Sequence, residues 1–131
     1  MAKPEDAVLL LNQKLLQAVG SGDYETYASL CDPSLTCFEP EALGHLVGGL
    51  AFHEFYFDAP AAPGVAGRVL NSMSNPHVRM MSTTAAVVSY VRLTQKVVNC
   101  IPETHAVQET RVWEEKDGKW VHVHVHRSPC K

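Results

Sequence analysis

The spacing of apolar side chains predicts two helices in the first thirty residues. Along residues 8–19, apolar positions recur with the period of one helix face. Pro4 and the two acidic residues after it suit a helix start, where free N–H groups and the helix dipole favour negative charge. A Gly-Ser-Gly segment at residues 20–22 is expected to end this helix. Asp23 can cap a second, shorter helix, which Asp32-Pro33 is expected to end.

The middle of the chain predicts a short strand and a third helix, and the remainder predicts strands. Leu35–Phe38 is the short strand, Pro40 marks a turn, and a helix of about ten residues starts at Gly48 or Gly49 and ends near Asp58. Beyond residue 67, β-branched residues alternate with polar ones, which is typical of a meander of antiparallel strands. The predicted strands are Arg68–Ser74, His77–Met81, Ala85–Val98, His105–Glu115 and Lys119–Arg127. This order indicates an α+β fold, with N-terminal helices packed on a strongly curved antiparallel sheet.

The composition describes one globular domain over residues 1–131. Hydrophobic residues make up 46% and charged residues 19% of the chain, so it can bury a core of its own. The net charge of −3 argues against nucleic-acid binding, which needs clustered Lys and Arg. No apolar run approaches the ~20 residues of a membrane span, and the N-terminus lacks the layout of a signal peptide. The four cysteines show no paired spacing, so free thiols and a cytoplasmic location are expected.

The predicted C-terminal hairpin carries two arginines whose relative placement depends on its turn. If residues 116–118 form a three-residue loop, Arg111 lies opposite Val123 and shares a face with Arg127. A two-residue Asp-Gly turn shifts the register by one and puts Arg111 opposite His124. The first register is favoured because it gives the last strand an inward face of alternating valines.

Three arginines are expected to meet in the hollow of the curved sheet. Arg111 and Arg127 would project into it, and Arg92 on a neighbouring strand can join them. Guanidinium groups stay charged and form forked hydrogen bonds, so such a cluster calls for carboxylates. Glu109 is the foremost internal candidate, which leaves room for an external carboxylate. The alternative is that each arginine is exposed or satisfied by Glu109, Glu114 or a backbone carbonyl.

Several motifs make the chain resemble a known family. FEPEALG, FHEFYF, NPHV, YVRLTQ and the ETRVW/DGKW pair are similar to motifs of the association (hub) domain of calcium/calmodulin-dependent protein kinase II. That domain has the cone-shaped fold of the nuclear transport factor 2-like superfamily. The resemblance implies a scaffold that assembles dimers into a closed two-tiered ring of about a dozen subunits or more. It also implies a pocket for small carboxylates or an acidic peptide segment, with no cofactor, formed by His53, Arg92, Arg111 and Arg127.

Two departures from the family pattern lie in loops. Residues 59–63 are Ala-Pro-Ala-Ala-Pro, where family members often carry bulky or aromatic side chains, so a side chain that lines or gates the pocket is expected to be missing. The segment KVVNCIPETH also differs from the usual glycine-containing hairpin loop.

The alternative function is a superfamily enzyme or small-molecule binder that uses His53 and the arginine cluster on an acidic ligand. His53 is the only evident base, and no Asp–His pair is in view. The Gly-rich loop, HRD and DFG signatures of kinases are absent from the sequence. We therefore expect no enzymatic activity from this chain.

Histidines and aromatic residues raise two further questions. Alternating histidines at positions 122, 124 and 126 are expected to share one strand face, opposite Arg127. Such an array can chelate zinc or copper, but no cysteine or carboxylate is placed to complete a site, so no metal is predicted. The aromatic residues of the third helix span most of its circumference, so some should contact a neighbouring subunit. They are Phe52, Phe55, Tyr56 and Phe57.

Overall fold

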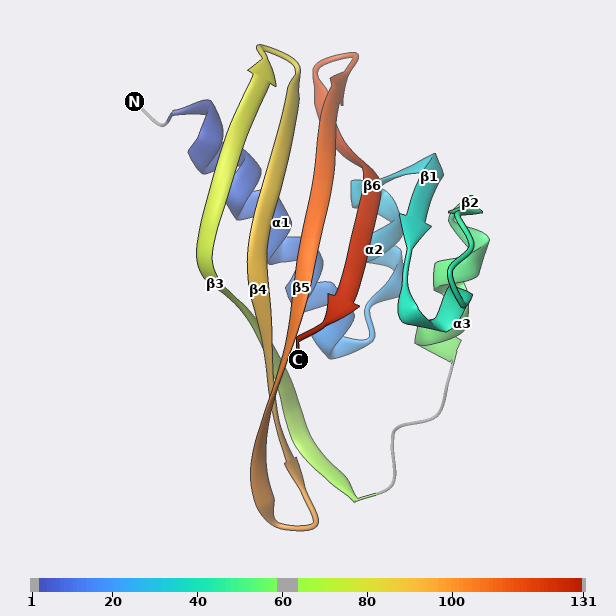
Figure 1. Cartoon of the computed structure of the whole chain (residues 1–131), viewed down its shortest axis with the longest axis vertical. Helices are drawn as coiled ribbons and strands as arrows, with labels where there is room; N and C mark the ends of the chain where they lie inside the picture. Colours follow the sequence, from blue (N-terminus) through green and yellow to red (C-terminus); the bar gives the residue numbers. More distant parts are fainter. Residues whose placement is uncertain (1–2, 59–63, 131) are drawn as a thin grey trace.

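Two helices lie against one face of a six-stranded sheet, and a third lies beside its edge (Figure 1). The computed structural model describes residues 3–58 and 64–130. The helices are α1 (Pro4–Ser21), α2 (Tyr24–Leu30) and α3 (Ala51–Asp58), with a 3-10 turn η1 (Pro40–Ala42). The strands are β1 (Cys31–Phe38), β2 (Val47–Gly48), β3 (Val65–Ser82), β4 (Ala85–Val98), β5 (Ile101–Lys116) and β6 (Lys119–Pro129). None of the described helices is long and apolar enough to cross a membrane.

The first two helices form where the sequence predicted them. α1 starts at Pro4, and the Asp6 carboxylate accepts a hydrogen bond from the backbone just before the helix. The helix ends before Gly22, whose φ of 71° is a left-handed conformation that glycine adopts without strain. Asp23 then caps α2 by accepting a hydrogen bond from the backbone N–H of Thr26.

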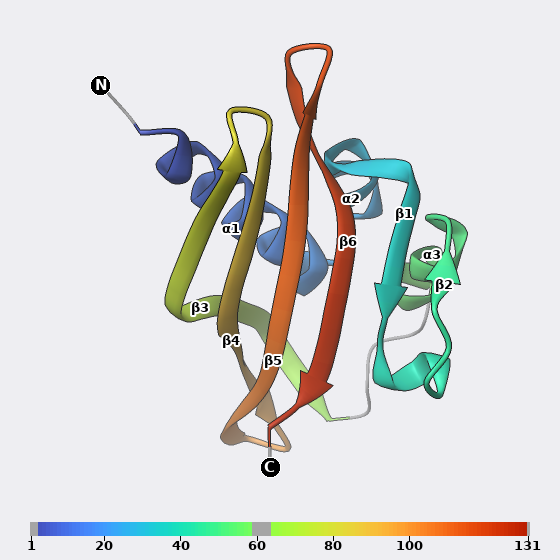
Figure 2. The ribbon, with the colours of Figure 1, turned by 45° about the horizontal axis from the view of Figure 1, so that its top comes forward.

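The sheet is mixed, with the strand order β2-β1-β6-β5-β4-β3. Strands β3 to β6 form the predicted antiparallel meander. β1 lies beside β6 and runs parallel to it (Figure 2), so the expectation of a wholly antiparallel sheet was wrong for this pair. The reason is that alternation along a strand predicts its two faces, whereas its partner and direction depend on segments far away in the chain.

The strands predicted at Arg68–Ser74 and His77–Met81 are two halves of β3. A break in the register separates them at Asn75, which has a φ of 49°. Such an irregularity bends a strand and increases its twist. Below the helices, β3, β4 and β5 continue as a twisted ribbon (Figure 1).

The hydrophobic core lies between α1 and the sheet. Val8, Leu15 and Leu16 on α1 are fully buried, as is Trp113 on β5. Burial of one such side chain stabilises the fold by about 1.5–3 kcal/mol. The indole N–H of Trp113 donates to the Oδ1 atom of Asn12 at 2.9 Å, so these buried polar atoms are satisfied. This bond connects α1 directly to β5.

The turn of the β5–β6 hairpin contains two residues, Asp117 and Gly118. Their φ values of 52° and 78° are those of a type I′ turn, which matches the twist of the flanking strands. The turn pairs Lys116 with Lys119. The favoured three-residue loop was therefore wrong, and the alternative two-residue turn is the one that forms.

A bulge in β6 then changes the register a second time. Val123 is the extra residue, since Trp113 pairs with His122 whereas Val112 pairs with His124. As a result, Arg111 lies opposite Val125, in neither of the two predicted positions. The inner face of β6 consists of Trp120, His122, Val125 and Arg127 in place of alternating valines.

Candidate functional site

The four residues predicted to form a pocket surround one cavity of about 130 Å³. His53 comes from α3, while Arg92, Arg111 and Arg127 come from the adjacent strands β4, β5 and β6. At ~30 Å³ per molecule, this volume holds about four waters or one small organic ligand. The remaining lining residues are Val19, Tyr27, Glu39, Glu41, Tyr56 and Phe57. The structure thus brings the four side chains together, while their role in binding stays a prediction.

Glu109 is buried between two of the arginines. Its Oε2 atom forms an ion pair with Arg92 Nη1 at 2.8 Å and accepts a hydrogen bond from Arg111 Nη2 at 3.2 Å. Its Oε1 atom accepts from Arg111 Nε at 3.1 Å and from the hydroxyl of Tyr90. Burial opposes the charge of Glu109, but Arg111 and then Arg92 outweigh burial and lower the pKa of this carboxyl. Both arginines therefore have an internal carboxylate, as the alternative interpretation of the arginine cluster expected.

Arg111 also fixes His122, which was expected on the other face of the sheet. The Nη1 atom of Arg111 lies 3.3 Å from His122 Nε2, and His122 Nδ1 lies 3.5 Å from the sulfur of Cys31. Because a guanidinium only donates, Nε2 accepts and Nδ1 carries the hydrogen. Burial, together with the charge of Arg111, lowers the pKa of His122 well below its ordinary value. His122 is thus a neutral core residue on the face opposite His124 and His126, so the three do not form one metal site.

Arg127 faces two carboxylates that the sequence did not single out. Its Nη2 atom lies 2.6 Å from Glu41 Oε1 and 4.0 Å from Glu39 Oε2. The two glutamates flank Pro40, where the chain turns after β1. In the sequence, the available sign of these partners was a pair of acids around a turn-forming proline. Three guanidinium groups therefore meet three carboxylates, and the cavity carries less positive charge than predicted.

Glu39 connects α3 to the cavity wall. Its Oε1 atom lies 3.3 Å from His53 Nε2, and its Oε2 atom accepts a hydrogen bond from the hydroxyl of Tyr56 at 2.8 Å. Burial opposes the charge of Glu39, but His53, Tyr56 and Arg127 together outweigh it and lower the pKa of Glu39 to about 2. A carboxylate–histidine pair is thus present, although no such pair was visible in the sequence.

The aromatic residues of α3 divide between the core and the surface. The ring of Phe57 lies 5.1 Å from that of Tyr27 and 5.3 Å from that of Tyr24. Phe55 is 71% exposed. The prediction that α3 cannot bury all its aromatic residues is confirmed, and their contact with a neighbouring subunit stays a prediction. The loop expected to lack a gating side chain, residues 59–63, lies outside the described residues.

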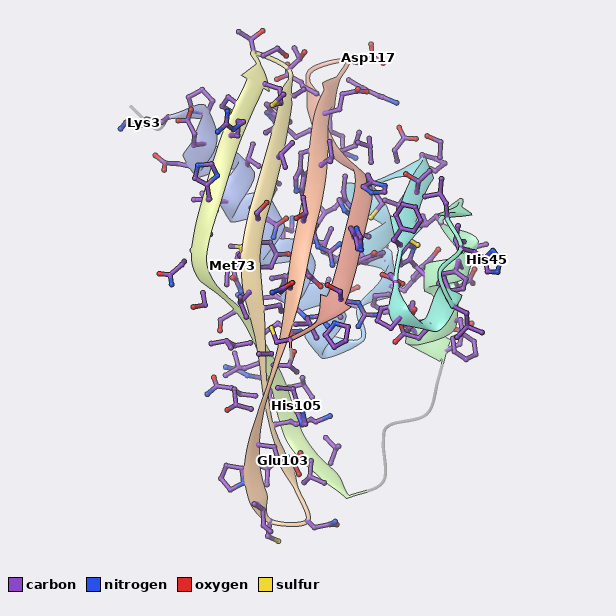
Figure 3. All side chains as sticks on the ribbon, in the orientation of Figure 1. Lys3, His45, Met73, Glu103, His105 and Asp117 are labelled. Atoms are coloured by element: carbon purple, nitrogen blue, oxygen red, sulfur yellow. The ribbon has the colours of Figure 1, made fainter. Side chains whose placement is uncertain are left out.

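Other ionisable side chains lie away from the cavity. Figure 3 shows Glu103 and His105 on the lower ribbon, where they form an exposed pair at 2.8 Å. Asp117 lies at the tip of the β5–β6 hairpin, and His45 projects at the edge of the molecule near β2. None of these four residues contributes to the cavity lining.

Comparisons of the chain with a family model and with known proteins point to the same family. The family model described as calcium/calmodulin dependent protein kinase II association domain matches residues 4–131. Calcium/calmodulin-dependent protein kinase type II subunit delta of Oryctolagus cuniculus is 44% identical over 123 residues, which make up 92% of this chain and 23% of that protein. The chain therefore spans less than a quarter of the length of this curated relative.

Solved structures resemble the chain over almost its full length. The CaMKII hub homology domain of Chlamydomonas reinhardtii is 59% identical, with a TM-score of 0.92 over 98% of this chain and 100% of that one. The association domain of C. elegans CaMKII is 47% identical, with a TM-score of 0.84 over 94% and 93% of the two chains. A nuclear transport factor 2-like protein from Salmonella enterica, 18% identical with a TM-score of 0.76 over 98% of this chain and 92% of that one, shares the fold alone. These similarities confirm the predicted α+β, nuclear transport factor 2-like fold.

Proposed function

The chain belongs to the calcium/calmodulin-dependent protein kinase II association-domain family, and on this premise we propose that it is a non-catalytic scaffold that assembles with copies of itself. The proposed assembly is a closed, two-tiered ring of dimers, because a closed ring leaves no heterologous surface unsatisfied and stops growing at a defined size. A ring of about a dozen subunits or more would hold any attached domains at high local concentration. The match of the family model to residues 4–131 is the observation that carries this proposal.

The sheet face opposite the helices supports self-association. In the described part of the chain, no helix covers this face (Figures 1 and 2). Val87 and Val112 pair across β4 and β5 there and are only partly buried. Large exposed apolar side chains elsewhere in the chain add further candidate contacts with a neighbouring subunit. They include Leu10, Leu43, Leu46, Phe55, Met81 and Ile101.

The assembly is tested by its mass. Native mass spectrometry at micromolar concentration should show a particle containing an even number of 14.4 kDa subunits, about a dozen or more. Light scattering in solution should give the same mass. A monomer or a simple dimer in both measurements would contradict the ring.

We also propose that the cavity binds small carboxylates. Arg127 is the arginine best placed for a ligand, because its partner Glu41 is partly exposed whereas Glu109, the partner of Arg111, is buried. A ligand carboxylate would replace Glu41 and form forked hydrogen bonds with Arg127. The Nε atom of Arg92 is buried and has no hydrogen-bond partner among the described residues, so it offers a further donor. A cavity of about 130 Å³ accommodates a small acid or one acidic side chain of a peptide.

Carboxylate binding by the cavity is tested by isothermal titration calorimetry with acetate and propionate. Arg127→Ala should weaken binding by about tenfold or more, since it removes a charged partner of the ligand. Glu41→Gln should strengthen binding several-fold, because it removes the internal competitor for Arg127. Glu103→Gln, which changes an exposed carboxylate away from the cavity, is the matched control and should bind like the wild type. Equal binding by the wild type and Arg127→Ala would remove the ligand proposal and leave the scaffold proposal in place.

The Glu39–His53 pair favours one alternative, a superfamily enzyme that acts on an acidic ligand. A carboxylate can orient an imidazole for proton transfer, and the pair borders the cavity. A turnover screen with carboxylate and enol substrates, repeated on His53→Ala, separates the two functions. Turnover by the wild type that His53→Ala loses would establish the enzyme.

A further inference from the structure

Three metal-binding side chains of different chemistry meet at the wall of the cavity. Cys37 lies at the end of β1, Glu39 follows two residues later, and His53 lies on α3. One sulfur, one carboxylate oxygen and one ring nitrogen from these residues lie within 4.8 Å of one another, and all three residues are buried. The period of an extended chain explains the first pair, since residues 37 and 39 point to the same side. We propose that Cys37, Glu39 and His53 form a binding site for Zn²⁺.

The spacing of the cluster suits this ion. Zn²⁺ prefers thiolate, imidazole and carboxylate ligands in a tetrahedral arrangement. Two ligands bonded at about 2.0–2.1 Å in that arrangement lie about 3.3 Å apart. This is the distance between Glu39 Oε1 and His53 Nε2. The sulfur of Cys37 lies within 4.8 Å of one carboxylate oxygen of Glu39 and one ring nitrogen of His53, so a movement of about 1 Å brings it into place.

Charge and proton balance are also satisfied. A thiolate and a carboxylate together neutralise the two charges of the ion. Burial, assisted by the charge of Glu39, raises the pKa of the Cys37 thiol to about 11, so the free thiol is protonated. Binding therefore displaces the thiol proton to solvent, and the ion takes the place of the hydrogen bond between His53 and Glu39. Because Glu39 and His53 line the cavity, the fourth position on the ion is available to water from that side.

The site differs from the one considered from the sequence. That hypothesis rested on the histidines of β6, and it led to the prediction of no metal. The proposed site of Cys37, Glu39 and His53 combines residues at the end of β1 with a residue of α3. These two segments share no sequence motif, so the sequence did not group them.

Titration with Co²⁺, a spectroscopic substitute for Zn²⁺, tests the proposal. The starting protein for the titration is the double variant Cys100→Ser, Cys130→Ser, which lacks the two exposed thiols. Co²⁺ should produce the intense near-ultraviolet absorption of a thiolate–cobalt bond, and Zn²⁺ should displace it. Cys37→Ala should abolish this absorption and weaken Zn²⁺ binding by about tenfold or more. Cys31→Ala, which removes a buried thiol outside the cluster, is the matched control and should leave both within about twofold.

Two outcomes of the Co²⁺ titration would overturn the site. One is the absence of thiolate–cobalt absorption in the starting protein, and the other is its loss in Cys31→Ala and retention in Cys37→Ala. X-ray absorption of the Zn²⁺-loaded Cys31→Ala protein supplies a test that does not require Cys37→Ala to fold. It should show one sulfur at about 2.3 Å from zinc, and a spectrum with only nitrogen and oxygen neighbours would refute the proposal.

Discussion

At the scale of single residues, acids and bases alternate around the cavity. Glu109 lies between Arg92 and Arg111, and Glu39 lies between His53 and Arg127. A buried charge is tolerated only where a partner of opposite sign replaces the lost water. The internal carboxylates therefore allow a core so rich in guanidinium groups.

Glu109→Gln is expected to destabilise the protein by about 3–5 kcal/mol, because two buried arginines lose their common counter-charge. The free energy of unfolding is measured by urea denaturation at constant protein concentration. Glu103→Gln on the same strand is the control, since its exposed pair with His105 should contribute less than about 1 kcal/mol. Equal losses in the two variants would contradict the role given to Glu109.

The lowered pKa of Glu39 predicts that the free energy of unfolding decreases in acid. Its pKa is about 2 in the folded protein and 4.5 ordinarily, so its ionisation favours folding. This contribution is complete above about pH 4.5 and is lost as the pH falls from about 4.5 to about 2. The free energy of unfolding of the wild type should therefore exceed that of Glu39→Gln by more at about pH 6 than at about pH 3. A difference independent of pH would contradict the shift.

At the scale of elements, small irregularities decide which side chains meet. The bulge at Val123 turns His122 and Arg127 to the inner face of β6 together, although their sequence separation is odd. Without that extra residue, a regular strand would place one of the two on the outer face. A single glycine also decides how closely α1 approaches β3. Because Gly20 has no side chain, the end of the helix lies directly against the backbone of β3.

Gly20→Ala tests this contact. A Cβ atom at residue 20 would lie 2.7 Å from the backbone oxygen of Val69, so the helix or β3 must move. We expect a loss of about 1–3 kcal/mol from overpacking, although alanine is the better helix former. Gly48→Ala is the control, because a Cβ atom there meets nothing within 4 Å. Thermal unfolding of both variants checks the prediction, and an unchanged or higher Tm for Gly20→Ala would contradict it.

At the scale of the whole molecule, the two faces of the sheet differ in burial. The helices bury one face in a core, while the other carries partly buried valines without a covering element in the described part of the chain. This asymmetry, together with the exposed apolar side chains near α3, leaves the folded subunit with apolar surface for contact with other subunits. Folding of the subunit and assembly of the ring are therefore expected to respond to different substitutions.

Phe55→Glu should lower the particle mass measured by native mass spectrometry while leaving the circular dichroism of the subunit unchanged. The side chain is 71% exposed, so its replacement costs the isolated subunit little, whereas a charge buried in an interface is unfavourable. Glu54→Gln, at the neighbouring exposed position of α3, is the control and should assemble like the wild type. An unchanged mass for Phe55→Glu would exclude this part of α3 from the interface.

The sequence by itself determined the parts of this protein that depend on neighbouring residues. The limits of α1 and α2 follow from Pro4, the glycine at residue 22 and the cap at Asp23. The strands follow from alternation, and the resemblance of short motifs to the family implied that His53, Arg92, Arg111 and Arg127 lie around one cavity. Each of these features is encoded within a few residues or in a short motif.

Only the tertiary structure decided what depends on contacts between distant segments. It made β1 and β6 parallel, placed the extra residue of β6 at Val123, and brought Glu39 and Glu41 to Arg127. Pairing direction, bulge position and internal ion pairs are set by packing of the whole chain, because several local arrangements have similar free energy until the core selects one. The arginines and Glu109 were readable from the sequence as a group, but Glu39 and Glu41 were identified as partners of Arg127 only in the folded structure.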